Sequence, residues 1–204
     1  MGIDPGSRTC GWGVVRRERG RFVRVASGAI RTKSETPMAI RLREIHDGLR
    51  DAMRLHGPDA VAIEAIFAHK SAASALVLGQ ARGVAMLAAA EAALPLFEYN
   101  ASTIKKSVTG SGKAEKSQVG FMVMRMLGIT LDGPADEADA LAIAVTHHAH
   151  AGMHAAIAAA AETAASVGRA KPVAAGAATT WDATNTAGAS TEVAPGPRRA
   201  RVPA

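Results

Sequence analysis

Carboxylates stand at the ends of apolar segments that are far apart in the sequence. Asp4 ends "GID", Glu64 ends "VAIE", and Asp136 and Asp139 belong to "PADEADALAIAV". Two residues three positions apart on a helix have Cβ atoms about 5–6 Å from each other, whereas Glu137 points roughly a third of a turn away. If the three segments converge in the fold, four carboxylates share one place.

Such convergence would create a site for divalent cations. Carboxylates repel each other by about 3 kcal/mol per pair at about 5 Å and an effective dielectric constant of about 20, so four of them need cations or protons. Oxygen ligands favour Mg²⁺ or Mn²⁺ over zinc, and two ions about 3.5–4 Å apart support in-line displacement at phosphorus. Singly, Asp4 can be a turn residue, and Asp136 and Asp139 can be helix-dipole partners. Glu64 is harder to dismiss, because apolar strands rarely end in an unpaired glutamate.

The segments between these acids predict an α/β fold. After "GID", the strands "CGWGVV" and "RFVRVASGAI" continue an antiparallel meander through a turn in "RERG". Strands at 60–64 and "LPLFEY" then alternate with helices, which predicts parallel connections and a five-stranded mixed sheet flanked by helices. If the strands of Asp4 and Glu64 are parallel neighbours, both acids emerge at one sheet edge. Helices are expected at 37–56, 71–93, 101–108, 115–127 and 135–150.

Composition indicates one main domain and its compartment. Residues 1–152 can supply a core, whereas 153–204 are rich in Ala, Thr, Gly and Pro, which predicts a flexible tail whose first part can extend a helix. The net charge of +6 favours polyanionic partners such as nucleic acid. A single cysteine, no signal peptide and no uninterrupted apolar run of roughly 20 residues predict a cytoplasmic chain without membrane association.

Four nearly colinear blocks within residues 1 to about 150 resemble the RuvC-type Holliday-junction resolvases, a family of ribonuclease-H-like fold. The resemblance implies that Asp4, Glu64, Asp136 and Asp139 are catalytic and bind two Mg²⁺ per subunit, with Mn²⁺ able to substitute. It also implies a homodimer that makes paired symmetric nicks in a four-way DNA junction, leaving 5′-phosphate and 3′-hydroxyl ends, alongside a branch-migration motor complex. The blocks are "GIDPGSRTCGWGVV", "VAIEAIFAHKSAASALVLGQARGVAMLAAA", "GKAEKSQV" and "PADEADALAIAVTHH".

One departure from this family concerns the first strand. Only Met1, Gly2 and Ile3 precede Asp4, fewer than the family's first strand normally has. We therefore expect a short central strand that anchors Asp4 more weakly.

Basic and aromatic residues near these blocks are candidates for DNA contacts. Phe67 can pack beneath its small-residue loop or wedge into an unstacked base step, and the family resemblance favours the wedge. Lysines among Ser, Thr and Gly suit phosphate contacts. Lys105 and Lys116 match positions that the family uses near the scissile phosphate, whereas Lys106 and Lys113 also fit an ordinary solvated loop.

Small residues four apart in the helix 71–93 permit close approach of another element. That element can be the sheet or a second subunit, and the family resemblance favours the subunit, because a C2 dimer supplies two equivalent sites to a roughly two-fold symmetric junction.

Other functions remain open to the sequence alone. A nuclease of the same fold acting on RNA ends also contains "IDPG". An actin-like ATPase or sugar kinase has a similar phosphate-binding hairpin, but needs two such lobes and a longer chain. A non-catalytic junction-binding protein would lack some of the acids, and all four are present.

The histidines of "HHAH" suggest a metal cluster, but imidazoles near a helix C-terminus are expected to interact with the helix dipole instead. They are His147, His148 and His150.

Overall fold

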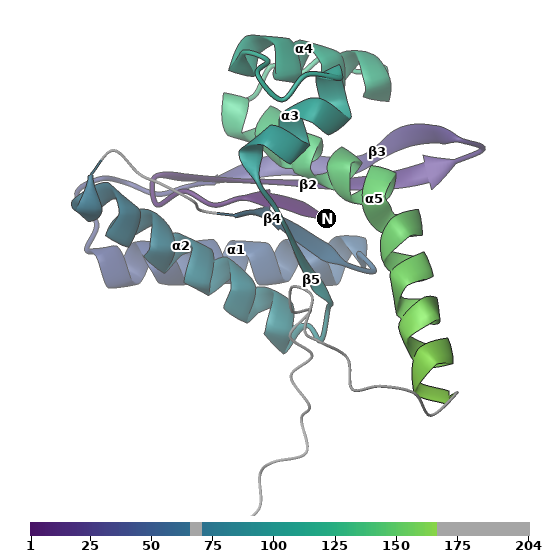
Figure 1. Ribbon diagram of the computed structural model, residues 1–204. Helices are drawn as coiled ribbons and strands as arrows, with labels where there is room; N and C mark the ends of the chain where they lie inside the picture. The colour runs from purple at the N-terminus through teal and green to yellow at the C-terminus, as the bar shows by residue number, and fades with distance from the viewer. Residues whose placement is uncertain (66–70, 167–204) are drawn as a thin grey trace, which may run out of the picture.

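A five-stranded mixed sheet forms the centre of the molecule (Figure 1). The structure is a computed structural model that describes residues 1–65 and 71–166, with side chains up to residue 152. Strands β1 to β3 pair antiparallel, whereas β4 pairs in parallel with β1 and β5, in the order β3-β2-β1-β4-β5. The predicted mixed sheet is therefore confirmed. The strands are β1 (Gly2–Asp4), β2 (Thr9–Glu18), β3 (Arg21–Arg31), β4 (Val61–Glu64) and β5 (Leu96–Tyr99).

The β2–β3 hairpin is closed by a two-residue turn inside the predicted "RERG" segment. Arg19 and Gly20 have positive φ angles of 48° and 85°, the backbone of a type I′ turn, whose twist matches that of paired antiparallel strands. Both strands extend farther than their apolar pattern indicates. Ladder hydrogen bonds need only the backbone, so pairing continues through the exposed residues Arg16, Arg17 and Glu18.

Helices cover both faces of the sheet (Figure 1). On one face α1 (Met38–His56) packs against α2 (Ala72–Glu91), and on the other lie α3 (Ala101–Thr109), α4 (Lys116–Leu127) and α5 (Ala135–Ser166). All five helices were predicted, but α5 continues well beyond residue 150 because its alanine-rich sequence has high helix propensity. The predicted boundary after residue 152 falls inside α5, and the rest of the predicted tail, from 167 on, lies outside the described residues.

Strand alternation assigns the acids to one face. In β1, Ile3 belongs to the buried cluster beneath α1 and α2, so its neighbours Gly2 and Asp4 point toward α5. In β4, Ile63 belongs to the same cluster, so the next residue, Glu64, also points toward α5. The two acids therefore share both a strand end and a sheet face.

Candidate active site

Asp4 and Glu64 end neighbouring parallel strands. The register pairs the residues just before them, Ile3 with Ile63, so the two acids lie side by side at the carboxyl edge of the sheet, where α/β proteins bind ligands. Strand β1 is short, as predicted, with only three residues. It is nevertheless hydrogen-bonded to β2 on one side and to β4 on the other, so Asp4 does not lie at a free sheet edge.

Glycines allow the start of α5 to lie directly on the sheet. Gly11 pairs with Asp4 across β1 and β2, and a Cβ atom on Gly11 would come within 2.0 Å of the backbone oxygen of Asp136. A Cβ atom on Gly2 would likewise lie 2.1 Å from a backbone oxygen of α5. Only glycine fits these positions, and this close contact brings Asp136 and Asp139 next to Asp4.

The carboxylates perturb each other's ionisation. The pKa of Asp4 is raised to about 7, first by burial and then by the charges of Asp139, Glu64 and Asp136, while Lys116 acts to lower it. Burial also raises the pKa of Glu64, and the charge of Asp139 adds to this effect. Repulsion among acids from β1, β4 and α5 is thus built into this fold, and positive charge placed among them favours their ionised forms.

Two lysines supply such charge. Lys116, the first residue of α4, places Nζ 2.5 Å from Oδ2 of Asp139, and this hydrogen bond raises the pKa of Lys116. Burial still raises the pKa of Asp139, because its desolvation outweighs the lysine. Burial raises the pKa of Glu64, and the charges of Lys116 and of Lys105, the latter from α3, oppose this rise. Lys116 is thus in direct contact with the acids, and Lys105 acts on them through its charge.

The chemistry of these donors suits a hard cation. All four side chains offer carboxylate oxygens, which Mg²⁺ and Mn²⁺ prefer, and their repulsion favours a bound positive charge. Among the residues that the structure describes, however, no three Asp, Glu, His or Cys side chains are grouped so that they could hold one ion together, and Asp139 is paired with Lys116. The acids fit a divalent cation by donor type and charge, but in the described residues they are not gathered around one shared ion position.

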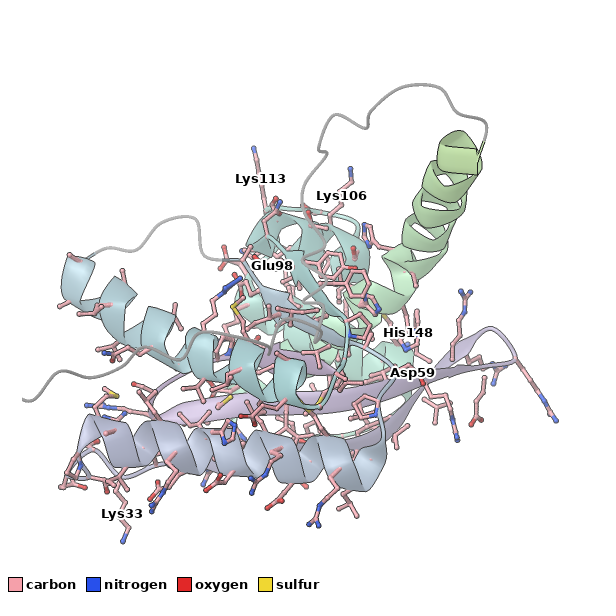
Figure 2. All side chains as sticks on the ribbon, turned by 90° about the horizontal axis from the view of Figure 1, so that it is seen from below. Lys33, Asp59, Glu98, Lys106, Lys113 and His148 are labelled. Atoms are coloured by element: carbon pink, nitrogen blue, oxygen red, sulfur yellow. The ribbon has the colours of Figure 1, made fainter. Side chains whose placement is uncertain are left out.

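The remaining predicted DNA contacts lie elsewhere. Lys106 and Lys113 are exposed and point outward from the α3–α4 region (Figure 2). Phe67 lies outside the described residues.

Glu137, the third acid at the start of α5, anchors the helix. Its side chain is buried, and Ser27 donates a hydrogen bond to Oε1 of Glu137 at 2.5 Å. Arg24 lies 3.8 Å from the same oxygen, so the first turn of α5 is tied to β3. This partner of Glu137 was not predicted, because nothing in the sequence pattern of β3 indicates that Ser27 faces α5.

Arg41, which the sequence analysis also missed, holds the loop that follows Asp4. It is only 7% exposed, and its Nε donates to the backbone oxygen of Ser7 at 3.1 Å and to Oγ1 of Thr32 at 3.0 Å. Its Nη2 donates to Oγ of Ser7 at 3.0 Å. Oxygens of two loops thus satisfy the buried guanidinium of Arg41. In the sequence, Arg41 cannot be distinguished from a surface arginine of an amphipathic helix.

The histidines were expected to interact with the dipole at a helix C-terminus. This expectation was wrong, because α5 does not end near them. They lie inside the helix and make hydrogen bonds rather than complement a terminal dipole. His147 Nδ1 is hydrogen-bonded to the hydroxyl of Tyr99 at 2.9 Å, and His148 Nε2 donates to the backbone oxygen of Val15 at 2.7 Å. These bonds join α5 to β5 and β2.

Comparison with known proteins assigns the family. The family model described as "Crossover junction endodeoxyribonuclease RuvC" matches residues 1–147. A relative of that name from Anaeromyxobacter sp. (strain Fw109-5) is 51% identical over 178 residues, covering 85% of this chain and 86% of its own.

Solved structures agree with this assignment. The Thermus thermophilus RuvC structure is 33% identical, with a TM-score of 0.68, over 75% of this chain and 95% of that one. The structure of T. thermophilus RuvC in complex with a Holliday junction substrate gives a TM-score of 0.71 at 34% identity, over 75% of this chain and 94% of that one. The ribonuclease-H-like fold expected from the sequence is thus confirmed, and the chain belongs to the RuvC family of crossover junction endodeoxyribonucleases.

Proposed function

We propose that this chain resolves four-way (Holliday) DNA junctions as a homodimer that makes two symmetric nicks and leaves 5′-phosphate and 3′-hydroxyl ends. Family membership makes the chain an endonuclease, and a related structure has been solved with a Holliday junction substrate. The deoxyribonuclease family match does not favour the alternative of a nuclease for RNA ends. The single observation that carries the site is the register of β1 and β4, which brings Asp4 beside Glu64 on the face covered by α5.

The proposed catalytic residues hold two Mg²⁺ per subunit, with Mn²⁺ able to substitute. Asp4, Glu64, Asp136 and Asp139 fit this role because they are oxygen donors, and because burial and then mutual repulsion raise the pKa of Asp4 and Glu64. When bound, the ions would activate water for attack at phosphorus and stabilise the leaving 3′ oxygen.

The lysines orient DNA beside these acids. Lys116 already neutralises Asp139, so this carboxylate competes with a phosphate for the same ammonium group. We propose that Lys116 turns from Asp139 to the scissile phosphate when DNA binds, while Lys105 contacts the backbone near Glu64. Lys106 and Lys113 hold a more distant part of the junction arms by charge alone, and Phe67 is the proposed wedge at the junction centre.

The second subunit is proposed to pack on α2. This helix has an exposed apolar face with Leu76 and Leu87 at 67% and 52% exposure, and added Cβ atoms at Gly79 and Gly83 would meet nothing within 4 Å.

By length and composition alone α2 could also cross a membrane, and 22% of its apolar 18-residue stretch is buried. The packing of α2 on α1 and the ion pair of Arg82 with β5 favour a helix of the folded domain, and we propose a cytoplasmic enzyme that works with a branch-migration motor.

The deciding experiment is nicking of a synthetic four-way junction with Mg²⁺, compared with linear duplex and with single-stranded RNA of the same sequence. We expect paired nicks in the junction, products that ligase can reseal, and little cutting of the other substrates. Asp4→Asn and Glu64→Gln should abolish cutting while junction binding in gel shifts is kept. Full cutting by either variant, or preference for RNA, would overturn the proposal.

A further inference from the structure

Arg82 lies on the face of the sheet opposite to the carboxylates. In the β4–β5 register Glu98 is paired with Ile63, whose side chain packs beneath α1 and α2, so Glu98 faces α2. Arg82, on α2, places Nη2 2.6 Å from Oε2 of Glu98. Figure 2 shows Glu98 in a view from the side of the sheet that α1 and α2 cover.

The same guanidinium also reaches the end of β4. Its Nε donates to the backbone oxygen of Glu64 at 3.3 Å, and its Nη1 contacts Sδ of Met86 at 3.2 Å. Each nitrogen of the guanidinium therefore contacts a different partner. The Arg82 side chain is also mostly buried, with 13% exposed. A planar guanidinium held in this way has one orientation available to it.

Glu64 is placed where such support matters. It is the last residue of a four-residue strand, so few ladder hydrogen bonds hold its backbone in place. Neighbouring strands hold β4 within the plane of the sheet, and Ala65 N–H bonds to the Tyr99 carbonyl. Arg82 adds a contact from outside that plane, on the face opposite to the carboxylate.

We infer that Arg82 is a positioning residue for Glu64: by holding the Glu64 carbonyl against α2 and Glu98, it fixes where the Glu64 carboxylate emerges on the other face. The inference rests on the proposed function, because it takes Glu64 as one of the metal-holding acids. Partners that orient metal ligands typically change metal affinity or activity by about 10–100-fold when they are removed. An ordinary half-exposed ion pair, by contrast, contributes little to stability, and its loss should not change metal affinity or nicking.

The chain contains a control contact of similar exposure on the same helix. Glu91, also on α2, lies 2.8 Å from Nε2 of His46 of α1, and its side chain is 48% exposed against 46% for Glu98. Glu91→Gln alters this side-chain contact of α2 without contacting β4. Arg82→Lys is the discriminating variant, because lysine keeps the charge beside Glu98 but lacks the planar fork whose separate nitrogens reach Glu98 and the Glu64 carbonyl together. Arg82→Met removes both interactions.

The experiment measures four quantities for each full-length variant: the melting temperature, junction affinity without divalent ions, the single-turnover nicking rate at saturating enzyme, and Mn²⁺ affinity by calorimetry without DNA. We expect Arg82→Met to nick about 10–100-fold more slowly and to bind Mn²⁺ more weakly, with junction affinity within about twofold of wild type. Arg82→Lys should keep its melting temperature but lose at least about threefold in rate and in Mn²⁺ affinity. Glu91→Gln should match wild type in both.

Wild-type nicking and Mn²⁺ affinity in Arg82→Lys would overturn the inference, as would an equal loss in Glu91→Gln. If Arg82→Met fails to fold, Arg82→Lys decides the question. If the wild-type chain does not cut junctions at all, the proposed function fails, and the Mn²⁺ titration of Arg82→Lys against wild type still tests the positioning role separately.

Discussion

Gly11 and Asp136 are in backbone contact: a Cβ atom on Gly11 would lie 2.0 Å from the carbonyl oxygen of Asp136. Because Gly11 is also the ladder partner of Asp4, this contact fixes the distance between an acid on the central strand and the acids that open α5. The position of a helix relative to a sheet thus depends here on the absence of a side chain.

Gly11→Ala should therefore disrupt the site more than the fold. The added methyl group must push the start of α5 away, so we expect junction nicking to fall by about 100-fold, and overpacking to cost about 1–3 kcal/mol of the free energy of unfolding. Single-turnover nicking and urea unfolding measure the two effects. Gly120→Ala is the control, because its Cβ atom would meet only the Ala138 methyl group at 3.9 Å. A Gly11→Ala variant with wild-type nicking would contradict this account of the contact.

Asp4→Asn should stabilise the metal-free protein at alkaline pH while abolishing cutting. The folded-state pKa of Asp4, about 7, lies above its unfolded value near 3.8, so the folded state binds the proton more tightly and loses stability as pH rises from about 4 to 7. Asparagine has no such proton. The stabilisation by Asp4→Asn should therefore be greater at pH 8 than at pH 5, by up to about 3 kcal/mol.

Urea unfolding at the two pH values, in the presence of a chelator, checks this difference. Adding Mg²⁺ at pH 8 should stabilise the wild type more than Asp4→Asn. A pH-independent difference in the free energy of unfolding between the two proteins would show that burial and the neighbouring acids do not raise the pKa of Asp4.

Lys116→Ala should weaken both binding and cleavage. It removes a phosphate contact, so the slope of log affinity against log salt should become shallower by about one unit, and it also leaves Asp139 without its ion pair. Gel shifts across a salt series and single-turnover nicking measure the two effects. Lys33→Ala is the control, since Lys33 is exposed on the α1 side of the molecule (Figure 2). Unchanged slope and rate in Lys116→Ala would remove Lys116 from the proposed site.

Leu87→Glu should dissociate the proposed dimer. A charge in the middle of a buried apolar interface is costly, so analytical ultracentrifugation should show a monomer, and the two nicks in one junction should become uncoupled. Leu55→Glu, on α1 and 77% exposed, should leave the assembly unchanged. If Leu87→Glu sediments as wild type does, α2 is not the subunit interface.

The sequence predicted the elements of this fold well because they depend on local patterns. Alternating residues in β3 and the amphipathic period of α1 each specify one element without reference to the rest, and Pro and Gly residues mark where the first strand and α1 end. The helix that became α5 was expected to end near residue 150, although the alanine-rich segment after it was expected to be able to extend a helix, as it does to Ser166. The expected end near residue 150 changed the interpretation of the histidines, which lie inside the helix and bond to Tyr99 and Val15.

The candidate site was predicted only in part, because its support comes from long-range contacts. The acids are visible as charges that end apolar segments, and the resemblance named Lys105 and Lys116. Arg41 and Arg82 gave no such signal, since each is one of many arginines on helices and only tertiary structure shows that they are buried against strand ends. The pairing of Lys116 with Asp139 also required coordinates, because α4 and α5 are separate in sequence.

The glycine contacts between α5 and the first two strands limit how this chain can diverge over generations. Interiors filled by side chains absorb a substitution when neighbours adopt new rotamers, but two backbones in contact have nothing to rearrange. At Gly2 and Gly11 an inherited change would have to be matched by a new path for a whole helix. Variation should therefore accumulate on the outward surfaces of α1 and α4, while this narrow contact stays nearly invariant among descendants that keep the activity.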